Sequence, residues 1–135
     1  MSGNDEAKRW LRYAREDLQA AESMIGSDNA YPRHACWLAQ QAAEKVLKSA
    51  LILAQIDFPF SHDLDRLRDL LPDVWRVKKE CPDLAELTEW AVQARYPGDM
   101  PEAVEADAQT ATEQAEKVVE AVVADLKARG VIDDS

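Results

Sequence analysis

Apolar side chains recur at alternating steps of three and four residues over three long stretches of this sequence. Such a period places one buried stripe along an α-helix, whereas a half-buried strand needs an apolar side chain at every second position. The stripes predict helices over residues 5–25, 32–55 and 101–129, and no strand-like alternation of useful length appears. We therefore predict an all-α fold, a compact up-down bundle of about five helices.

The middle stretch differs from the other two because its apolar residues nearly surround the helix axis. A helix that is apolar on most sides is packed on most sides, so we expect helix 32–55 to be central. Two shorter helices should follow it, one between residues 61 and 72 and one from residue 82 to residues 97–98. Residues 73–81 remain ambiguous, since only a few apolar side chains could anchor a helical turn there.

Prolines and glycines set the predicted ends of the last helix. Pro101 suits a first helical turn, so the helix should open there, with Val104 as the first member of its buried stripe. Gly130 should provide the left-handed residue that follows the helix end.

Length and composition limit the class of protein. The 135 residues fit one domain, 1–135, with an acidic tail at about 130–135. No apolar run approaches the roughly 18 residues of a membrane span, and the polar start is no signal peptide, so we expect a cytoplasmic protein without a membrane partner. Two cysteines and two histidines at scattered spacings predict neither a metal site nor a disulfide framework, and we expect no cofactor.

The net charge of −10 is unevenly spread, because residues 99–135 hold ten of the 26 acidic side chains and only three of the 16 basic ones. Binding of nucleic acid over the whole surface is unfavourable for such a chain, since phosphates need a cationic footprint. A local basic face on the first two thirds of the chain is compatible with these numbers.

Polar side chains of the central helix gather on one side of it. Within an arc of roughly 140° at 100° per residue lie five of them and one tryptophan: Trp37, Gln40, Gln41, Glu44, Lys45 and Lys48. One interpretation is a ligand site, in which lysines meet phosphate and glutamines contact a base or ribose. The other is a solvated face with an ordinary Glu44–Lys48 ion pair.

Two further pairs are candidates for this site. His62 could bind a ligand or act as an acid or base, although His62 and Asp63 could equally cap the helix that follows. Arg95 could clamp a phosphate and Tyr96 could stack on a base, or both could simply complete a helix end.

The four tryptophans favour core or interface positions over a stacking platform, with Trp37 as the exception because it shares the polar arc. Asp17 could pair with a basic residue of the central helix, but we expect it to be solvated.

Several segments together resemble the HEPN-domain family. They are WLRYAREDL at 10–18, ACWLAQQAAEKVLKSAL at 35–51, HDL at 62–64, ARYPG at 94–98 and the long last helix. The resemblance spans roughly residues 5–128, and the order AQQAAEK, HDL, ARYPG is its most specific part. It implies a compact helical bundle, often dimeric, in a family whose members are often encoded beside a small nucleotidyltransferase in toxin–antitoxin or related pairs.

Some members of that family are ribonucleases, and others are non-catalytic modules that bind nucleotides or RNA. The ribonuclease signature of the family is an Arg followed, after four to six residues, by a His. Neither His34 nor His62 has an Arg at that distance, so the resemblance implies the branch without the signature.

Together these observations favour a non-catalytic module with no catalytic residues, whose ligand is a nucleotide or an RNA element. Candidate ligand-binding residues share the polar arc or a helix end: Trp37, Gln41, Glu44, Lys48, His62, Arg95 and Tyr96. We expect a homodimer, and the resemblance implies a nucleotidyltransferase partner. One alternative is a divergent metal-independent ribonuclease that uses His62 with Arg95. Another is a purely structural dimerisation domain, in which the polar arc would be exposed and convex.

Overall fold

A computed structural model describes residues 3–93 and 101–133 of the chain. Over these ranges the chain forms six α-helices and no β-strand. The helices are α1 (Gly3–Met24), α2 (Pro32–Leu53), α3 (Leu64–Asp69), α4 (Arg76–Glu80), α5 (Ala85–Gln93) and α6 (Glu105–Ala128). The predicted all-α class is confirmed, and the additional helix is α4, which forms in the segment 73–81 that the sequence left ambiguous.

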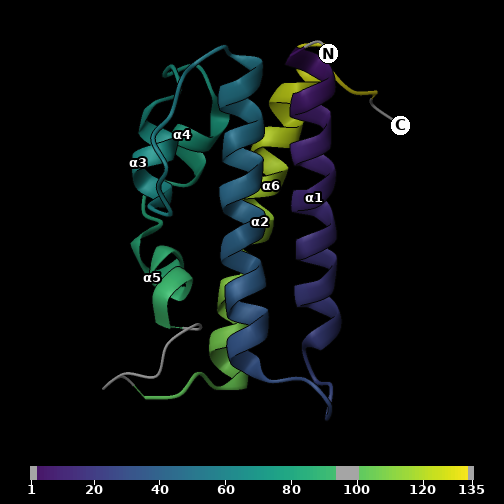
Figure 1. The fold of residues 1–135 in the computed structure, drawn as a ribbon, viewed down its shortest axis with the longest axis vertical. Helices are drawn as coiled ribbons and strands as arrows, with labels where there is room; N and C mark the ends of the chain where they lie inside the picture. The colour runs from purple at the N-terminus through teal and green to yellow at the C-terminus, as the bar shows by residue number, and fades with distance from the viewer. Residues whose placement is uncertain (1–2, 94–100, 134–135) are drawn as a thin grey trace.

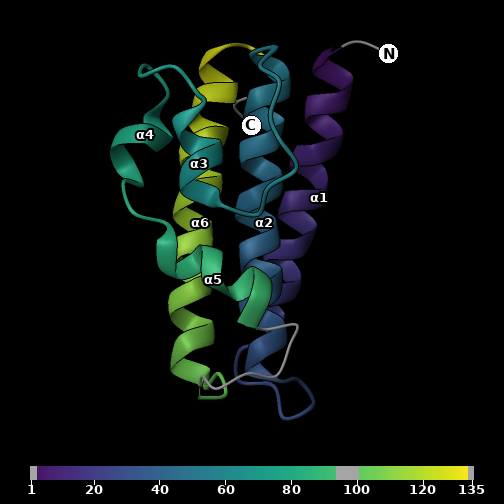
Figure 2. The ribbon, with the colours of Figure 1, turned by 60° about the vertical axis from the view of Figure 1, so that its left-hand side comes forward.

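The three long helices give the bundle its shape. α2 packs along its length against both α1 and α6, with α1 running opposite to α2 and α6 running parallel to it (Figure 1). The short helices α3, α4 and α5 descend on the side away from α1 and bring the chain back to the end of the bundle where α6 starts (Figures 1 and 2). The central place predicted for α2 and the up-down path are therefore both observed.

Alanine supplies many of the contacts between the long helices. Buried alanines lie on all three: Ala7, Ala14 and Ala21 on α1, Ala35, Ala39, Ala42, Ala43 and Ala50 on α2, and Ala108, Ala111, Ala115 and Ala121 on α6. Small side chains let helix backbones approach closely, while larger residues such as Val46 fill the space between them. Trp75 is also buried in this core, with the Arg129 guanidinium 4.2 Å from its ring centre.

Two predicted helix starts are wrong, and in both cases a carboxylate explains the difference. α5 begins at Ala85 rather than at Pro82, because the Leu84 amide donates a hydrogen bond to Asp65 on α3 instead of entering the helix. α6 begins at Glu105 rather than at Pro101, and the Val104 amide donates to the Asp107 carboxylate at 2.9 Å.

The side chain of Val104 consequently stands in solvent and does not head the buried stripe of α6. The end predicted for α6 is confirmed, since Gly130 has a left-handed φ of 75°. The helix end predicted at residues 97–98 lies outside the described residues. None of the helices in the described ranges combines the length and the apolar character that a bilayer span requires.

Candidate functional site

The segment that leaves α2 folds back over the side of that helix. Gln55 takes a left-handed backbone conformation with a φ of 60°, and the Ile56 amide donates to the Leu51 carbonyl at 2.9 Å. From this turn the chain runs down beside α2 until α3 begins at Leu64 (Figure 2). A left-handed glutamine is less favourable than a left-handed glycine, so tertiary contacts must hold the turn in place.

Three side chains of the polar arc of α2 lie beneath this returning segment and are buried. Gln40, Glu44 and Lys48 are only 0%, 5% and 6% exposed. The interpretation of the arc as a solvated face is therefore wrong, and so is the exposed arc expected for a purely structural dimerisation domain. Burial of a charged pair without a structural need usually costs stability, which makes the arrangement a candidate for function.

Glu44 is the centre of the buried group. Its Oε1 lies 2.7 Å from Nδ1 of His62, and its Oε2 accepts a hydrogen bond from Lys48 Nζ at 2.9 Å. Gln40 Nε2 also donates to Glu44 Oε1, at 3.2 Å. We call Gln40, Glu44, Lys48 and His62 the Glu44 cluster.

Gln40 joins the cluster to the backbone of the returning segment. Its Nε2 donates a second hydrogen bond to the carbonyl oxygen of His62 at 3.1 Å, and its Oε1 accepts one from Gln41 Nε2 at 2.8 Å. Each polar atom of this fully buried amide thus has a partner. The position of His62 is fixed twice, through its ring by Glu44 and through its carbonyl by Gln40.

Three aromatic rings surround the ammonium group of Lys48. Their centres lie 5.8 Å from Nζ for Trp10, 5.8 Å for Phe58 and 5.9 Å for Phe60. Ring faces attract a cation at such distances, and the effect grows when water is excluded. The Lys48 charge is therefore held by Glu44 on one side and by aromatic rings on the others.

Glu44 stays ionised in this buried place. Burial by itself raises the pKa of the carboxyl group, but hydrogen bonds from His62, Lys48 and Gln40, together with the Lys48 charge, lower the pKa below its ordinary value. Because an ionised carboxylate only accepts hydrogen bonds, Nδ1 of His62 must donate to it. The other ring nitrogen, Nε2, bonds to no residue that the structure describes and can meet a ligand.

The Glu44 cluster reaches solvent through His62 and its neighbour Phe60. The His62 side chain is 36% exposed, and Phe60 is 91% exposed, the highest value among the large apolar residues that the structure describes. Their rings meet edge to face with centres 5.4 Å apart. The rings of Phe60 and His62 thus lie next to each other at the surface, and the buried polar side chains of Gln40, Glu44 and Lys48 lie beneath them.

The structure brings together four of the seven predicted site residues. Glu44, Lys48 and His62 are in direct contact, and Gln41 joins them through Gln40. Trp37 lies on the same helix but shares no described contact with the cluster, and its buried Nε1 has no hydrogen-bond partner within the described part of the chain. Arg95 and Tyr96 lie outside the described residues.

His62 and Asp63, which were both predicted as possible caps, have different roles in the structure. Asp63 is the N-cap of α3 and accepts a hydrogen bond from the Arg66 amide, as the capping interpretation predicts. His62 is not a cap, because its ring is bound to Glu44. Asp17, expected to be solvated, instead pairs with Lys45 of α2 at 2.5 Å.

Sequence reasoning missed the aromatic cover of Lys48. Trp10, Phe58 and Phe60 come from α1 and from the segment after α2, so no periodic pattern connects them. The only local signal was the Phe58-Pro59-Phe60 sequence, in which two aromatic residues flank a proline within a polar loop. Aromatic residues in a loop indicate that the loop packs against another part of the protein.

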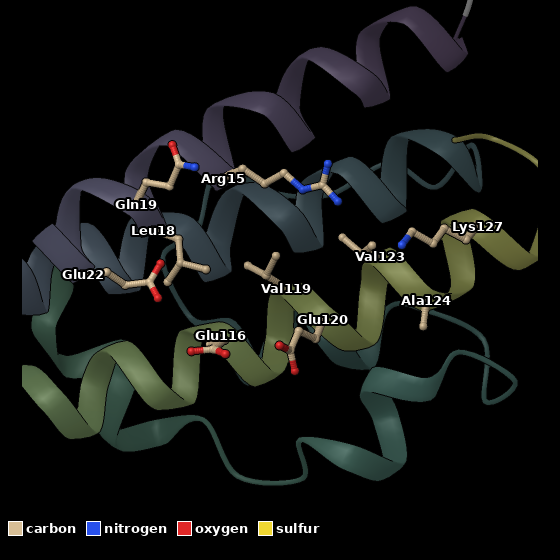
Figure 3. A pocket seen from close by; sticks show the side chains of 10 residues that line it. All are labelled: Arg15, Leu18, Gln19, Glu22, Glu116, Val119, Glu120, Val123, Ala124 and Lys127. Carbon is tan, nitrogen blue, oxygen red and sulfur yellow. The ribbon is translucent and has the colours of Figure 1, made fainter. Parts of the chain in front are cut away.

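A concave region lies between α1 and α6, away from the Glu44 cluster. It is a groove of about 510 Å³ with Leu18, Val119 and Val123 among its lining residues (Figure 3). Arg15 and Lys127 line it on the side nearer the start of α1, while Glu22 and Glu116 lie toward the other end. The groove contains none of the predicted site residues, and Leu18, Val119 and Val123 are already buried.

The comparisons with known proteins concern almost the whole chain. Residues 7–127 match the family model of the HEPN domain. The crystal structure of TT1696 from Thermus thermophilus is similar, with a TM-score of 0.73 and 30% sequence identity, over 87% of this chain and 96% of that one. None of the curated proteins compared with the chain matches it in sequence. The matched range includes all members of the Glu44 cluster and their aromatic cover.

Proposed function

The chain belongs to the HEPN-domain family, and from this premise we propose that it is a non-catalytic module that binds a nucleotide or a short nucleic-acid element at the Glu44 cluster. The observation that carries the proposal is the pairing of the exposed Phe60 ring with His62, whose imidazole is fixed by Glu44. Binding sites combine an apolar surface with a few fixed polar groups, and this place in the molecule has both.

Absence of catalysis is proposed from the sequence. The family's ribonuclease signature requires four to six residues between the Arg and the His, and positions 55–57, which stand at that distance from His62, hold Gln, Ile and Asp. Of the cations near His62, Lys48 is already paired with Glu44. A cleavage reaction would need a cation free to stabilise the charge that develops on phosphate.

A metal-independent ribonuclease is the second candidate function, and one observation favours it. A carboxylate that holds Nδ1 of a histidine leaves Nε2 oriented as a general base, which could accept the proton of a ribose 2′-hydroxyl. Arg95 would have to supply the missing cation. Incubation of the protein with single-stranded and structured RNA distinguishes the two functions, because only the ribonuclease shortens the RNA and loses this activity on His62→Ala substitution.

Two protein partners complete the proposal. Family membership supports a homodimer and a nucleotidyltransferase supplied by a separate chain, since both accompany the resemblance described above. Sedimentation at micromolar concentration tests the first, with twice the monomer mass expected. Co-purification with a nucleotidyltransferase encoded beside this protein tests the second, and a protein that elutes alone in both experiments contradicts this part of the proposal.

Calorimetric titration with ATP, GTP and a short single-stranded RNA tests the binding function. We expect at least one of these ligands to bind and the His62→Ala variant to bind it more weakly. His34→Ala is the matched control, because His34 is an exposed histidine outside the cluster. Absence of binding by all three ligands at millimolar concentration, or equal weakening by the two substitutions, contradicts the proposal.

A further inference from the structure

The charge of the Glu44 cluster limits the part of a ligand that it can recognise. Lys48 is its only lysine or arginine, and Nζ of Lys48 lies 2.9 Å from the carboxylate of Glu44. The lysine side chain is 8% exposed and the glutamate side chain 6%, so the two opposite charges cancel at short range beneath the surface. A phosphate at the surface would meet a paired charge that is covered by aromatic rings.

The exposed part of the site is aromatic and carries no paired charges. Phe60 is 91% exposed, and its neighbour His62 offers Nε2, to which none of the described residues bonds. The hydrogen bonds that join His62 to Glu44 and Gln40 hold its imidazole against the Phe60 ring, with the ring centres 5.4 Å apart. A nucleobase has a flat face to stack on an aromatic ring and an edge of donors and acceptors to meet a fixed imidazole.

We propose that this site recognises an unstacked nucleobase through Phe60 and His62, and that phosphate contributes little to the affinity. The inference rests on the proposed function and reverses the expectation, drawn from the sequence, that Lys48 binds phosphate. Lys48 has a positioning role instead: it neutralises Glu44, which in turn orients His62. The natural ligand is therefore a nucleoside, a mononucleotide or a flipped-out base of single-stranded RNA.

Titration with three probes separates this inference from the proposed function. The probes are adenosine, ATP and inorganic triphosphate, each added to the full chain. We expect adenosine and ATP to bind with affinities within about a factor of ten, the difference made by one weak hydrogen bond. Inorganic triphosphate should not bind, and the ATP affinity should be nearly independent of salt because no phosphate is contacted.

Substitution of Phe60 tests the stacking contact without disturbing the core, since the side chain is almost fully exposed. Phe60→Ala should weaken adenosine binding roughly 5- to 150-fold, the range measured for loss of one base–aromatic contact. Phe60→Trp should retain the affinity. Tyr31→Ala, which removes another exposed aromatic side chain immediately before α2, is the control and should leave binding unchanged.

Each outcome has a separate meaning. Binding of ATP and triphosphate without binding of adenosine overturns the inference and leaves nucleotide binding intact. Adenosine binding that does not respond to Phe60→Ala also overturns it, because the base must then be recognised elsewhere. Failure of ATP, adenosine and single-stranded RNA alike removes the proposed function, and the inference with it.

Discussion

The two sides of α2 both contain buried side chains but carry opposite chemistry. One side presents Ala39, Ala43 and Val46, none of which has any exposed surface, and its packing follows directly from the apolar stripe. The other side presents Gln40, Glu44 and Lys48 to the segment that folds back from the end of the helix. Burial of apolar surface stabilises a fold, whereas burial of an ion pair roughly balances its desolvation cost.

The apolar side of α2 contributes stability, whereas the polar side needs a different explanation. Hydrophobic residues in place of Glu44 and Lys48 would pack at least as well, so stability alone does not explain the pair. Departures from the simplest stable choice are concentrated at functional sites in natural proteins. The polar side of α2 therefore carries the proposed function and the apolar side carries the fold.

The largest effect is expected from a charge placed on the apolar side. Val46→Asp should lower the free energy of unfolding by about 4 kcal/mol or more, because the new carboxylate has no partner and the packing of a valine is lost. Urea denaturation followed by circular dichroism measures the change. Val74→Asp, at an exposed valine before α4, should change the stability by less than about 0.5 kcal/mol. Similar losses in both variants would contradict the central position of α2.

A double-mutant cycle on the polar side should give a different pattern. Glu44→Leu leaves Lys48 charged without its carboxylate. Lys48→Met leaves Glu44 without its lysine, although His62 and Gln40 still donate hydrogen bonds to it. Each single substitution should destabilise the protein, by up to about 3 kcal/mol. The double variant should recover part of that loss, because no charge is left without an opposite charge, while His62 and Gln40 still lack their acceptor on Glu44. Losses that simply add would show that the two side chains do not act as a pair in the fold.

Acid should weaken the protein through Glu44. The pKa of Glu44 is lower in the folded protein than its ordinary value of 4.5, so its contribution to stability is complete above that value and disappears as the pH falls through the lower, folded pKa. Below pH 4.5 the wild type should therefore lose stability more steeply than Glu44→Gln, by at most about 1.4 kcal/mol per pH unit for one proton. Glu113→Gln on the exposed side of α6 should keep the wild-type slope, and identical slopes in all three proteins would exclude this role of Glu44.

The smallest effect concerns the second charged pair of α2. Asp17 and Lys45 are partly exposed, at 20% and 25% of their side chains, so Asp17→Asn should lower the stability by less than about 1 kcal/mol. Glu16→Gln breaks the Arg12–Glu16 pair, which is mostly exposed and 3.9 Å long, and should cost about 0.3 kcal/mol. A loss for Asp17→Asn as large as that for Glu44→Leu would mean that burial does not distinguish the two pairs.

The helical period predicted the fold because it is a property of each helix alone. The stripes of α1, α2 and α6 determine which sides of these helices are buried, and the same period placed Gln41, Glu44 and Lys48 on one side of α2. Burial of that side could not be predicted, because the cover comes from an irregular segment. The path of this segment depends on the left-handed Gln55 and on the hydrogen bond from Gln40 to the His62 carbonyl. No periodic pattern in the sequence predicts either feature.

The predicted starts of α5 and α6 were wrong for a related reason. Pro82 and Pro101 suit a first helical turn, but the amides of Leu84 and Val104 bond to carboxylates and remain outside α5 and α6. Asp65, which holds Leu84, belongs to another helix, so its effect appears only once the chain is folded. Local preference gave the order of the elements correctly, and tertiary contacts moved their boundaries.

The position of the Glu44 cluster along the chain has a consequence for the order of folding. Its members and their aromatic cover all lie between Trp10 and His62, whereas α6 packs against α2 only after the long segment from α3 to α5 has been placed. Contacts between segments close in sequence form sooner than distant ones, because less chain entropy is lost in closing the loop. The hairpin of α1 and α2, with the returning segment above it, should therefore assemble early, and α6 should dock onto a hairpin that already holds its binding residues.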